Sequence, residues 1–222
     1  MFIKGKNIDF LFLHSICLVG GAFVDLFYDQ LLLTLLLGAF LFSIYIFQNW
    51  KSFTTFKKWG GIPNVITLTR LVLLFTIPFL TETKELALLS LIVISLDGLD
   101  GFFARKLNQV TDFGGKLDME VDAYYCLLFS LLIGVLHPEL SWIIFGGLLR
   151  YLYKIITFIF SQSTFVEQKK KYARFIAGFY FVSFPLFFLV PNTIGIYLIT
   201  AGTAFIIFSF SISFYEFFTF RK

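Results

Sequence analysis

The feature of this sequence that most limits its fold is a series of long apolar stretches running through nearly all of its 222 residues. A helix that crosses a lipid bilayer needs about 20 mostly apolar residues. The sequence therefore predicts an all-α, polytopic transmembrane bundle of about eight helices. The expected spans are 8–24, 31–48, 63–80, 86–106, 113–136, 140–160, 173–190 and 193–216.

The overall composition supports a membrane protein and argues against several other classes. Hydrophobic residues make up 58% of the chain and charged residues 14%, and the mean hydropathy of +0.85 is too high for a water-soluble surface. A net charge of +4 without a clustered basic face gives no basis for a nucleic-acid partner. Cys17 and Cys126 stand alone in apolar stretches, so we expect small core residues and no disulfide.

The first quarter of the chain has two parts with different expected structures. Residues 1–49 begin like a secretion signal, with a basic start and an apolar run, but a second apolar run follows at once and favours a pair of retained membrane helices. Residues 50–61 are too polar to span, and their aromatic residues recur at helical spacing, which predicts an amphipathic helix in the membrane interface. Its expected role is to anchor the bundle, and shaping an entrance for a lipid is the alternative. The aromatic residues are Trp50, Phe53, Phe56 and Trp59.

Lysine and arginine gather in alternate loops, and this bias predicts the orientation of the bundle. Loops rich in Lys and Arg stay on the cytoplasmic side of a membrane. We therefore expect both termini in the cytoplasm, and we expect the bacterial inner membrane as the location. The opposite loops carry mainly acidic residues, with Lys84 as their single lysine. The basic positions on the predicted inner side are Lys4, Lys6, Lys51, Lys57, Lys58, Arg105, Lys106, Lys116, Lys169, Lys170, Lys171, Arg174, Arg221 and Lys222.

Four aspartates are concentrated in two neighbouring spans, where ionisable groups are expensive. Asp97 and Asp100 are three residues apart, and Asp118 and Asp122 are four apart, so each pair shares one face of its helix. Because the loop between the two helices is short, we expect antiparallel neighbours whose four carboxylates converge near the cytoplasmic side.

Four converging carboxylates would repel one another unless positive charge lies among them. Oxygen ligands without His or Cys suit Mg²⁺, Mn²⁺ or Ca²⁺, and metals that bridge phosphates are typically held by a few carboxylates plus the substrate. The alternative is a set of structural salt bridges with Arg70, Arg105 or Lys116.

Glycines accompany the acids. Gly98 and Gly101 lie on the first helix, and Gly114 and Gly115 open the second. A bare backbone lets a ligand come close. Close helix packing through small residues is the competing explanation for Gly98, Gly115 and Gly134.

The whole stretch resembles the signature of the CDP-alcohol phosphatidyltransferase family, D-x-x-D-G-x-x-A-R, eight residues, G, three residues, D, three residues, D. The fixed positions that match are Asp97, Asp100, Gly101, Ala104, Arg105, Gly114, Asp118 and Asp122. Residues 62–70, IPNVITLTR, look like the usual opening of the family's first core helix. The resemblance implies a six-helix catalytic domain over residues 62–222, preceded by two additional helices, and it suggests a homodimer.

The resemblance also implies roles for individual residues. Asp97, Asp100, Asp118 and Asp122 would hold a pair of Mg²⁺ or Mn²⁺ ions bridged to the donor diphosphate, with Asp122 as the general base. The residues implied at the CDP-bearing donor are Asn64, Thr67, Gly101, Ala104, Arg105 and Gly114. Of these, Gly101 and Ala104 would leave room for the nucleotide, and Asn64, Thr67 and Arg105 would contact its end or brace the acids.

Cations further along the chain are candidates for binding the acceptor. Arg150 and Lys154 share one helix face, and Arg150 falls near mid-membrane, where a cation should face a cavity. With Lys171 and Arg174 they could bind an anionic alcohol. Ordinary positive-inside topology and snorkelling are the alternative for Lys154 and for residues 169–171. His14 and His137 lack ligand company, and we expect structural or solvated roles.

The expected function is transfer of a phosphatidyl group from a CDP-activated lipid, such as CDP-diacylglycerol, to a small polar alcohol, with release of CMP. A rival within the class transfers a CDP-linked head group to diacylglycerol, and the signature does not separate the two. An ion-conducting transporter is a rival from another class, but it leaves the Gly-x-x-Ala-Arg spacing without a reason. A protein that keeps the fold without activity is a further alternative that no substitution favours.

Overall fold

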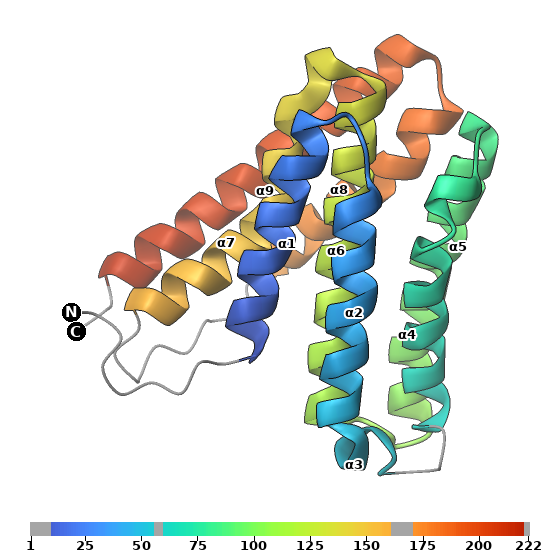
Figure 1. Cartoon of the computed structure of the whole chain (residues 1–222), viewed down its shortest axis with the longest axis vertical. Coiled ribbons are helices and arrows are strands. Elements are labelled where there is room, and N and C mark those ends of the chain that lie inside the picture. Colours follow the sequence, from blue (N-terminus) through green and yellow to red (C-terminus); the bar gives the residue numbers. More distant parts are fainter. Residues whose placement is uncertain (1–9, 56–59, 161–170, 220–222) are drawn as a thin grey trace.

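The computed structural model describes residues 10–55, 60–160 and 171–219, and these residues form an all-helical bundle (Figure 1). Two short 3₁₀ turns, Ile77–Phe79 and Pro138–Ile143, connect helices on one end of it. The helices are α1 (Phe10–Phe27), α2 (Leu32–Gln48), α3 (Trp50–Phe53), α4 (Gly61–Leu74), α5 (Thr83–Lys106), α6 (Asp112–Leu136), α7 (Ile144–Phe160), α8 (Lys171–Leu189) and α9 (Asn192–Thr219).

Helix α6 is the centre of the bundle. In its most apolar stretch 78% of the residues are buried within the protein, against 28–39% for the other long apolar helices. It contacts α1, α2, α4, α7 and α8. Polar side chains within this stretch of α6 are therefore mostly surrounded by other helices and not by lipid.

Among the described residues, six helical segments are long and apolar enough to cross a membrane: α1, α5, α6, α7 with its preceding 3₁₀ turn, α8 and α9. The expected span 63–80 is wrong as one continuous helix, because α4 ends at Leu74. There Phe75 donates its N–H to Val72, the Thr76 hydroxyl binds the Leu73 carbonyl, and Pro78 has no N–H to continue the ladder. Helix α2 is also shorter than these six, at 17 residues.

Only part of the segment expected in the membrane interface is described. Helix α3 covers four residues, and Thr54 and Thr55 follow as a turn and bend, while residues 56–59 lie outside the described residues. Phe53 is buried and its ring meets Phe113 edge-on, whereas Trp50 is half exposed. The described part of this segment therefore attaches to the start of α6. It lies at the lower end of the bundle in Figure 1, beside the turn between α5 and α6.

The N-terminal hairpin of α1 and α2 is fastened at two levels. The buried Asp25 carboxylate accepts the backbone N–H groups of Leu33, at 3.0 Å, and Thr34, at 2.6 Å, and so satisfies the start of α2 from the preceding helix. The Tyr124 hydroxyl of α6 donates to the Thr34 carbonyl at 3.1 Å. A Cβ added at Gly38 would lie 2.1 Å from the same hydroxyl, so the hairpin fits closely over this tyrosine.

The α6 and α7 backbones approach closely at Gly147. A Cβ added there would lie 2.8 Å from the Leu127 Cα and 2.8 Å from the Cys126 carbonyl oxygen. Backbone atoms cannot move aside as a flexible side chain can. This contact therefore depends on glycine, as is common where membrane helices pack through small residues.

We predict that Gly147→Ala destabilises the protein by about 1–3 kcal/mol through overpacking. The measurement is thermal unfolding of the purified protein in detergent, followed by circular dichroism. Gly178→Ala on α8 is the matched control, because an added Cβ there meets nothing within 4 Å. Equal unfolding temperatures for both variants would contradict the close approach at Gly147.

Candidate metal and phosphotransfer site

The turn between α5 and α6 sets the relative positions of the aspartates. Asn108 adopts a positive φ of 52°, which reverses the chain directly after α5. Thr111 then caps α6 by accepting the Gly114 N–H at 2.9 Å on its hydroxyl. The two helices run antiparallel from this turn, so residues near the end of α5 face residues near the start of α6.

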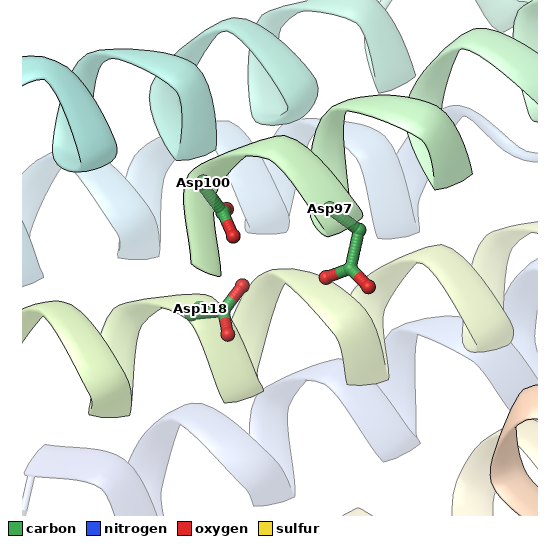
Figure 2. Close-up of side chains that lie close together, drawn as sticks. All are labelled: Asp97, Asp100 and Asp118. Atoms are coloured by element: carbon green, nitrogen blue, oxygen red, sulfur yellow. The ribbon is translucent and has the colours of Figure 1, made fainter. Parts of the chain in front are cut away.

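Three of the four predicted metal ligands lie together in the structure. Asp97 and Asp100 extend from α5 toward Asp118 on α6 (Figure 2), and one carboxylate oxygen from each lies within 4.8 Å of the others. Asp100 is buried, and the other two are half-buried. Asp122 lies one turn beyond Asp118 on α6, outside this group of three, and is linked to it through an arginine.

That arginine is Arg70, which extends from α4 and is fully buried. One guanidinium nitrogen lies 2.9 Å from Asp97, 3.0 Å from Asp100 and 2.7 Å from Asp118, and the other pairs with Asp122. Helix α4 packs against both α5 and α6, so it delivers this cation between them. All four signature acids therefore share one counter-ion.

The salt-bridge alternative is thus partly realised, but by one cation alone. Within the described part of the chain, every ion pair of these acids is made with Arg70, while Arg105 and Lys116 are exposed and take no part. Four ionised carboxylates around one guanidinium leave a formal charge of minus three. The residual charge and the all-oxygen donor set fit one or two hard divalent cations such as Mg²⁺ or Mn²⁺.

A cavity of about 100 Å³ opens beside the acids and gathers most of the predicted donor contacts. Its wall includes Asp100 and Asp118, and the Thr67 hydroxyl donates to Asp100 at 2.9 Å. Arg105 is exposed and is not part of the wall. Five of the six predicted donor residues line the cavity: Asn64, Thr67, Gly101, Ala104 and Gly114.

The glycines of α5 and α6 differ in their surroundings. A Cβ at Gly114 would lie 2.8 Å from the Asn64 side-chain oxygen and 2.9 Å from the Thr111 hydroxyl, so any larger residue would disturb the cavity wall. Gly98 and Gly115 have open space where a Cβ would be, which gives no support for helix packing at these two positions. At Gly134 a Cβ would lie 3.2 Å from the Ser141 Cα, which supports packing there.

Asp122 lines a second cavity, of about 180 Å³. This cavity lies between α6, α7, α8 and α9, and most of its lining is apolar. Among the residues that line the cavity, Arg150 is the basic one. Its mid-membrane position in the sequence predicts that it faces a cavity. The structure therefore places one predicted acceptor-binding cation in the same cavity as the predicted base.

The other predicted acceptor-binding cations have different surroundings. Lys154 forms an ion pair with Glu120 of α6, and Arg174 is exposed on α8. Helix α8 begins at Lys171, whose side chain lies outside the described residues. His14 is buried 3.7 Å from Glu120, and His137 lies 3.4 Å from Glu139 on the surface.

Two residues at the site were not singled out from the sequence. Arg70 was considered only as one of several salt-bridge partners, although an arginine inside an apolar helix is itself a signal of function. Glu120 is a fifth acid in the same region. It was overlooked because it occupies a variable position of the signature, between Asp118 and Asp122.

Comparison with known proteins assigns the chain to a family. A family model described as CDP-alcohol phosphatidyltransferase matches residues 61–213, which is more than half of the chain. The chain belongs to this family. The match begins at α4 and includes all four aspartates, so it confirms the family that the signature resembles, and it identifies an integral membrane protein.

Individual relatives match shorter segments. A CDP-diacylglycerol–glycerol-3-phosphate 3-phosphatidyltransferase of Wigglesworthia glossinidia brevipalpis is 33% identical over 43% of this chain and 56% of its own length. One with the same name from Aquifex aeolicus is 43% identical over 32% of this chain and 42% of its own length. A CDP-diacylglycerol–inositol 3-phosphatidyltransferase of Candida albicans is 39% identical over 35% of each chain. The matches thus span about a third to a little over half of these relatives, and no solved structure matches the chain.

We predict that Arg70→Gln lowers the free energy of unfolding by about 3–5 kcal/mol, because it leaves a cluster of half-buried carboxylates without its counter-ion. The measurement is thermal unfolding in detergent with a metal chelator present. Arg105→Gln serves as control, since this arginine is exposed and makes no ion pair with the acids among the described residues. Equal unfolding temperatures for the two variants would show that the acids do not depend on Arg70.

Proposed function

We propose that this protein transfers a phosphatidyl group from a CDP-activated lipid, such as CDP-diacylglycerol, to the hydroxyl of a small polar alcohol, releasing CMP in phospholipid synthesis. The observation that carries the proposal is the convergence of the signature acids beside a cavity walled by the signature glycine and alanine positions. The family match supports the reaction class, and the names of the relatives support CDP-diacylglycerol as donor.

The proposed metal ligands are Asp97, Asp100, Asp118 and Asp122, holding two Mg²⁺ or Mn²⁺ ions. Such ions neutralise a diphosphate and the charge that develops on its leaving group. In the present geometry Asp97, Asp100 and Asp118 are close enough to share an ion. Arg70 would hold the acids in register, since it contacts each of them.

The proposed donor site is the cavity between α4, α5 and α6. Asn64, Gly101, Ala104 and Gly114 line it, and it adjoins Asp100 and Asp118 directly. Small residues at 101, 104 and 114 leave room for a flat nucleotide next to the acids. Arg105 would contact the donor from the exposed rim, where its guanidinium lies over Gly101.

Asp122 is the proposed general base. It would accept the proton of the acceptor hydroxyl, whose oxygen then forms a bond to the β-phosphorus of the donor. The bond from that phosphorus to the bridging oxygen breaks, and CMP leaves with the electron pair. The ion pair with Arg70 fixes the orientation of the Asp122 side chain, which also lines the second cavity.

The second cavity is the proposed acceptor site, because it brings Asp122 and Arg150 together. Arg150 would bind an anionic group of the acceptor, with Lys154, Lys171 and Arg174 as further proposed contacts. An alcohol phosphate meets both requirements, a hydroxyl for the base and an anion for the arginine. Glycerol 3-phosphate, which appears in the names of two of the relatives, is the first acceptor to test.

The proposed location is a bacterial inner membrane with the acids toward the cytoplasm. The support is the bias of Lys and Arg toward one set of loops, including Arg105 and Lys106 at the end of α5, close to the acids. A CDP-lipid would then enter from the bilayer, and a soluble acceptor from the cytoplasm. We also propose a homodimer, on the basis of the family resemblance.

We predict that millimolar Mg²⁺ or Mn²⁺ raises the unfolding temperature of the wild-type protein, because ligands that bind only the folded state stabilise it. Asp118→Asn should abolish most of this rise by removing a central ligand. Asp112→Asn is the matched control, since Asp112 is an exposed acid at the start of the same helix. A metal-dependent rise of the same size in all three proteins would contradict the proposed ligand set.

We predict metal-dependent release of CMP when the purified protein is given CDP-diacylglycerol and its acceptor. The panel contains glycerol 3-phosphate, inositol phosphate, serine, inositol, choline and phosphatidylglycerol. Asp122→Asn should lower kcat by at least a hundredfold, the scale of a lost general base. If no acceptor supports release, the reversed reaction is tested with CDP-choline or CDP-ethanolamine and diacylglycerol, and silence there as well would refute the enzymatic proposal.

A further inference from the structure

A buried carboxylate on α6 occupies a variable position of the signature and has no role in the proposed reaction. Glu120 is 2% exposed and stands between Asp118 and Asp122. Residues two apart on a helix do not share a face, so Glu120 points away from the acids that Arg70 binds. It faces α1 and α7, which lie against each other in the bundle (Figure 1).

Two cations of α7 converge on this carboxylate. The Lys154 ammonium forms an ion pair with one oxygen of Glu120, and a guanidinium nitrogen of Arg150 lies 3.8 Å from the same oxygen. Both are residues proposed to bind the acceptor, and Arg150 also lines the cavity that contains Asp122. Arg150 therefore lies between Glu120 on one side and the proposed base on the other.

Helix α1 closes the remaining side of the carboxylate. His14 is 1% exposed, and its Nδ1 lies 3.7 Å from the second oxygen of Glu120. The His14 ring also lies near the buried Tyr151 ring, with centroids 6.1 Å apart. Helix α1 precedes the region that matches the family model, which begins at residue 61. A segment outside the matched region thus shields a charge cluster next to the acceptor cavity.

We propose that Glu120 is a positioning residue that fixes Arg150, together with Lys154, for binding of an anionic acceptor, and that α1 encloses this contact. The inference rests on the proposed function. Long basic side chains in a membrane protein tend to extend toward water. The buried Glu120 carboxylate, which lies beside α7, opposes this tendency and retains Arg150 at the cavity. At 3.8 Å the contact orients the guanidinium while leaving its N–H groups able to bind an acceptor anion.

The arrangement also explains why a fifth acid is tolerated here. A buried glutamate without a partner would be strongly unfavourable. Two cations from α7, Lys154 and Arg150, compensate its charge. Of the two cations, Arg150 also lines the cavity, where its guanidinium suits a phosphate-bearing or otherwise anionic acceptor.

The test is Glu120→Gln, which preserves the shape of the side chain and removes its charge. The KM for the acceptor identified in the panel should rise about tenfold, equivalent to about 1.4 kcal/mol. The KM for CDP-diacylglycerol should stay within twofold of the wild-type value. The Mn²⁺-dependent rise in unfolding temperature should stay within one degree of the wild-type rise. Glu139→Gln is the matched control, because Glu139 is an exposed glutamate beside His137 and distant in sequence from the acids.

The outcomes separate the inference from a purely structural role and from the proposed function. An unchanged acceptor KM, or an equal loss in both KM values and in kcat, overturns the positioning role. If wild-type protein releases no CMP with any acceptor or donor, the proposed function fails and this inference fails with it. If Glu120→Gln does not fold, the double variant with Lys154→Gln is tested instead, because it removes both charges of that ion pair. Its acceptor KM should also rise at least tenfold, and equality with wild type overturns the proposal.

Discussion

The contact on which the site depends is that of one buried guanidinium with four carboxylates. Arg70 belongs to α4, whereas its partners belong to α5 and α6, so the ion pairs join three helices at one point. In a bundle whose surface faces lipid, a charged side chain without an ionic partner has no water to solvate it. The same contact explains how α4, which has only 14 residues, is held in a fixed position. The signature glycine and alanine positions then form a cavity against this fixed framework.

Helix α6 carries a different polar function on each of its faces. Asp118 and Asp122 face Arg70, Glu120 faces the cations of α7, and Tyr124 binds the N-terminal hairpin. A helix with charges on opposite sides can lie in a membrane protein only if other helices surround it. Its high burial is therefore a requirement of its sequence as well as a result of packing. The consequence for the site is that Arg70 of α4 orients Asp118 and Asp122, whereas α7 orients Glu120.

The sequence allowed a reliable prediction of the features that depend on spacing along one helix. The all-helical bundle, the pairing of Asp97 with Asp100 and a helix that begins shortly before Gly114 all follow from local pattern, and the structure agrees. The residues whose roles were missed depend on which helices meet. Nothing local to Arg70 indicates that it serves all four acids, and the partners of Glu120 lie on two other helices. The early end of α4 also escaped prediction, because hydropathy alone does not register the local hydrogen bonds before Pro78.

The two attachments of the N-terminal hairpin differ in how much of the chain they require. The Asp25 carboxylate binds backbone groups eight and nine residues further on, so this contact can form as soon as α2 begins. The Tyr124 hydroxyl reaches across 90 residues to the Thr34 carbonyl. Because proteins are synthesised from the N-terminus, the Asp25 contact can form before α6 has been made, whereas the Tyr124 contact cannot. The internal cap thus allows the hairpin to form early, and the Tyr124 contact attaches the hairpin to α6 once that helix is present.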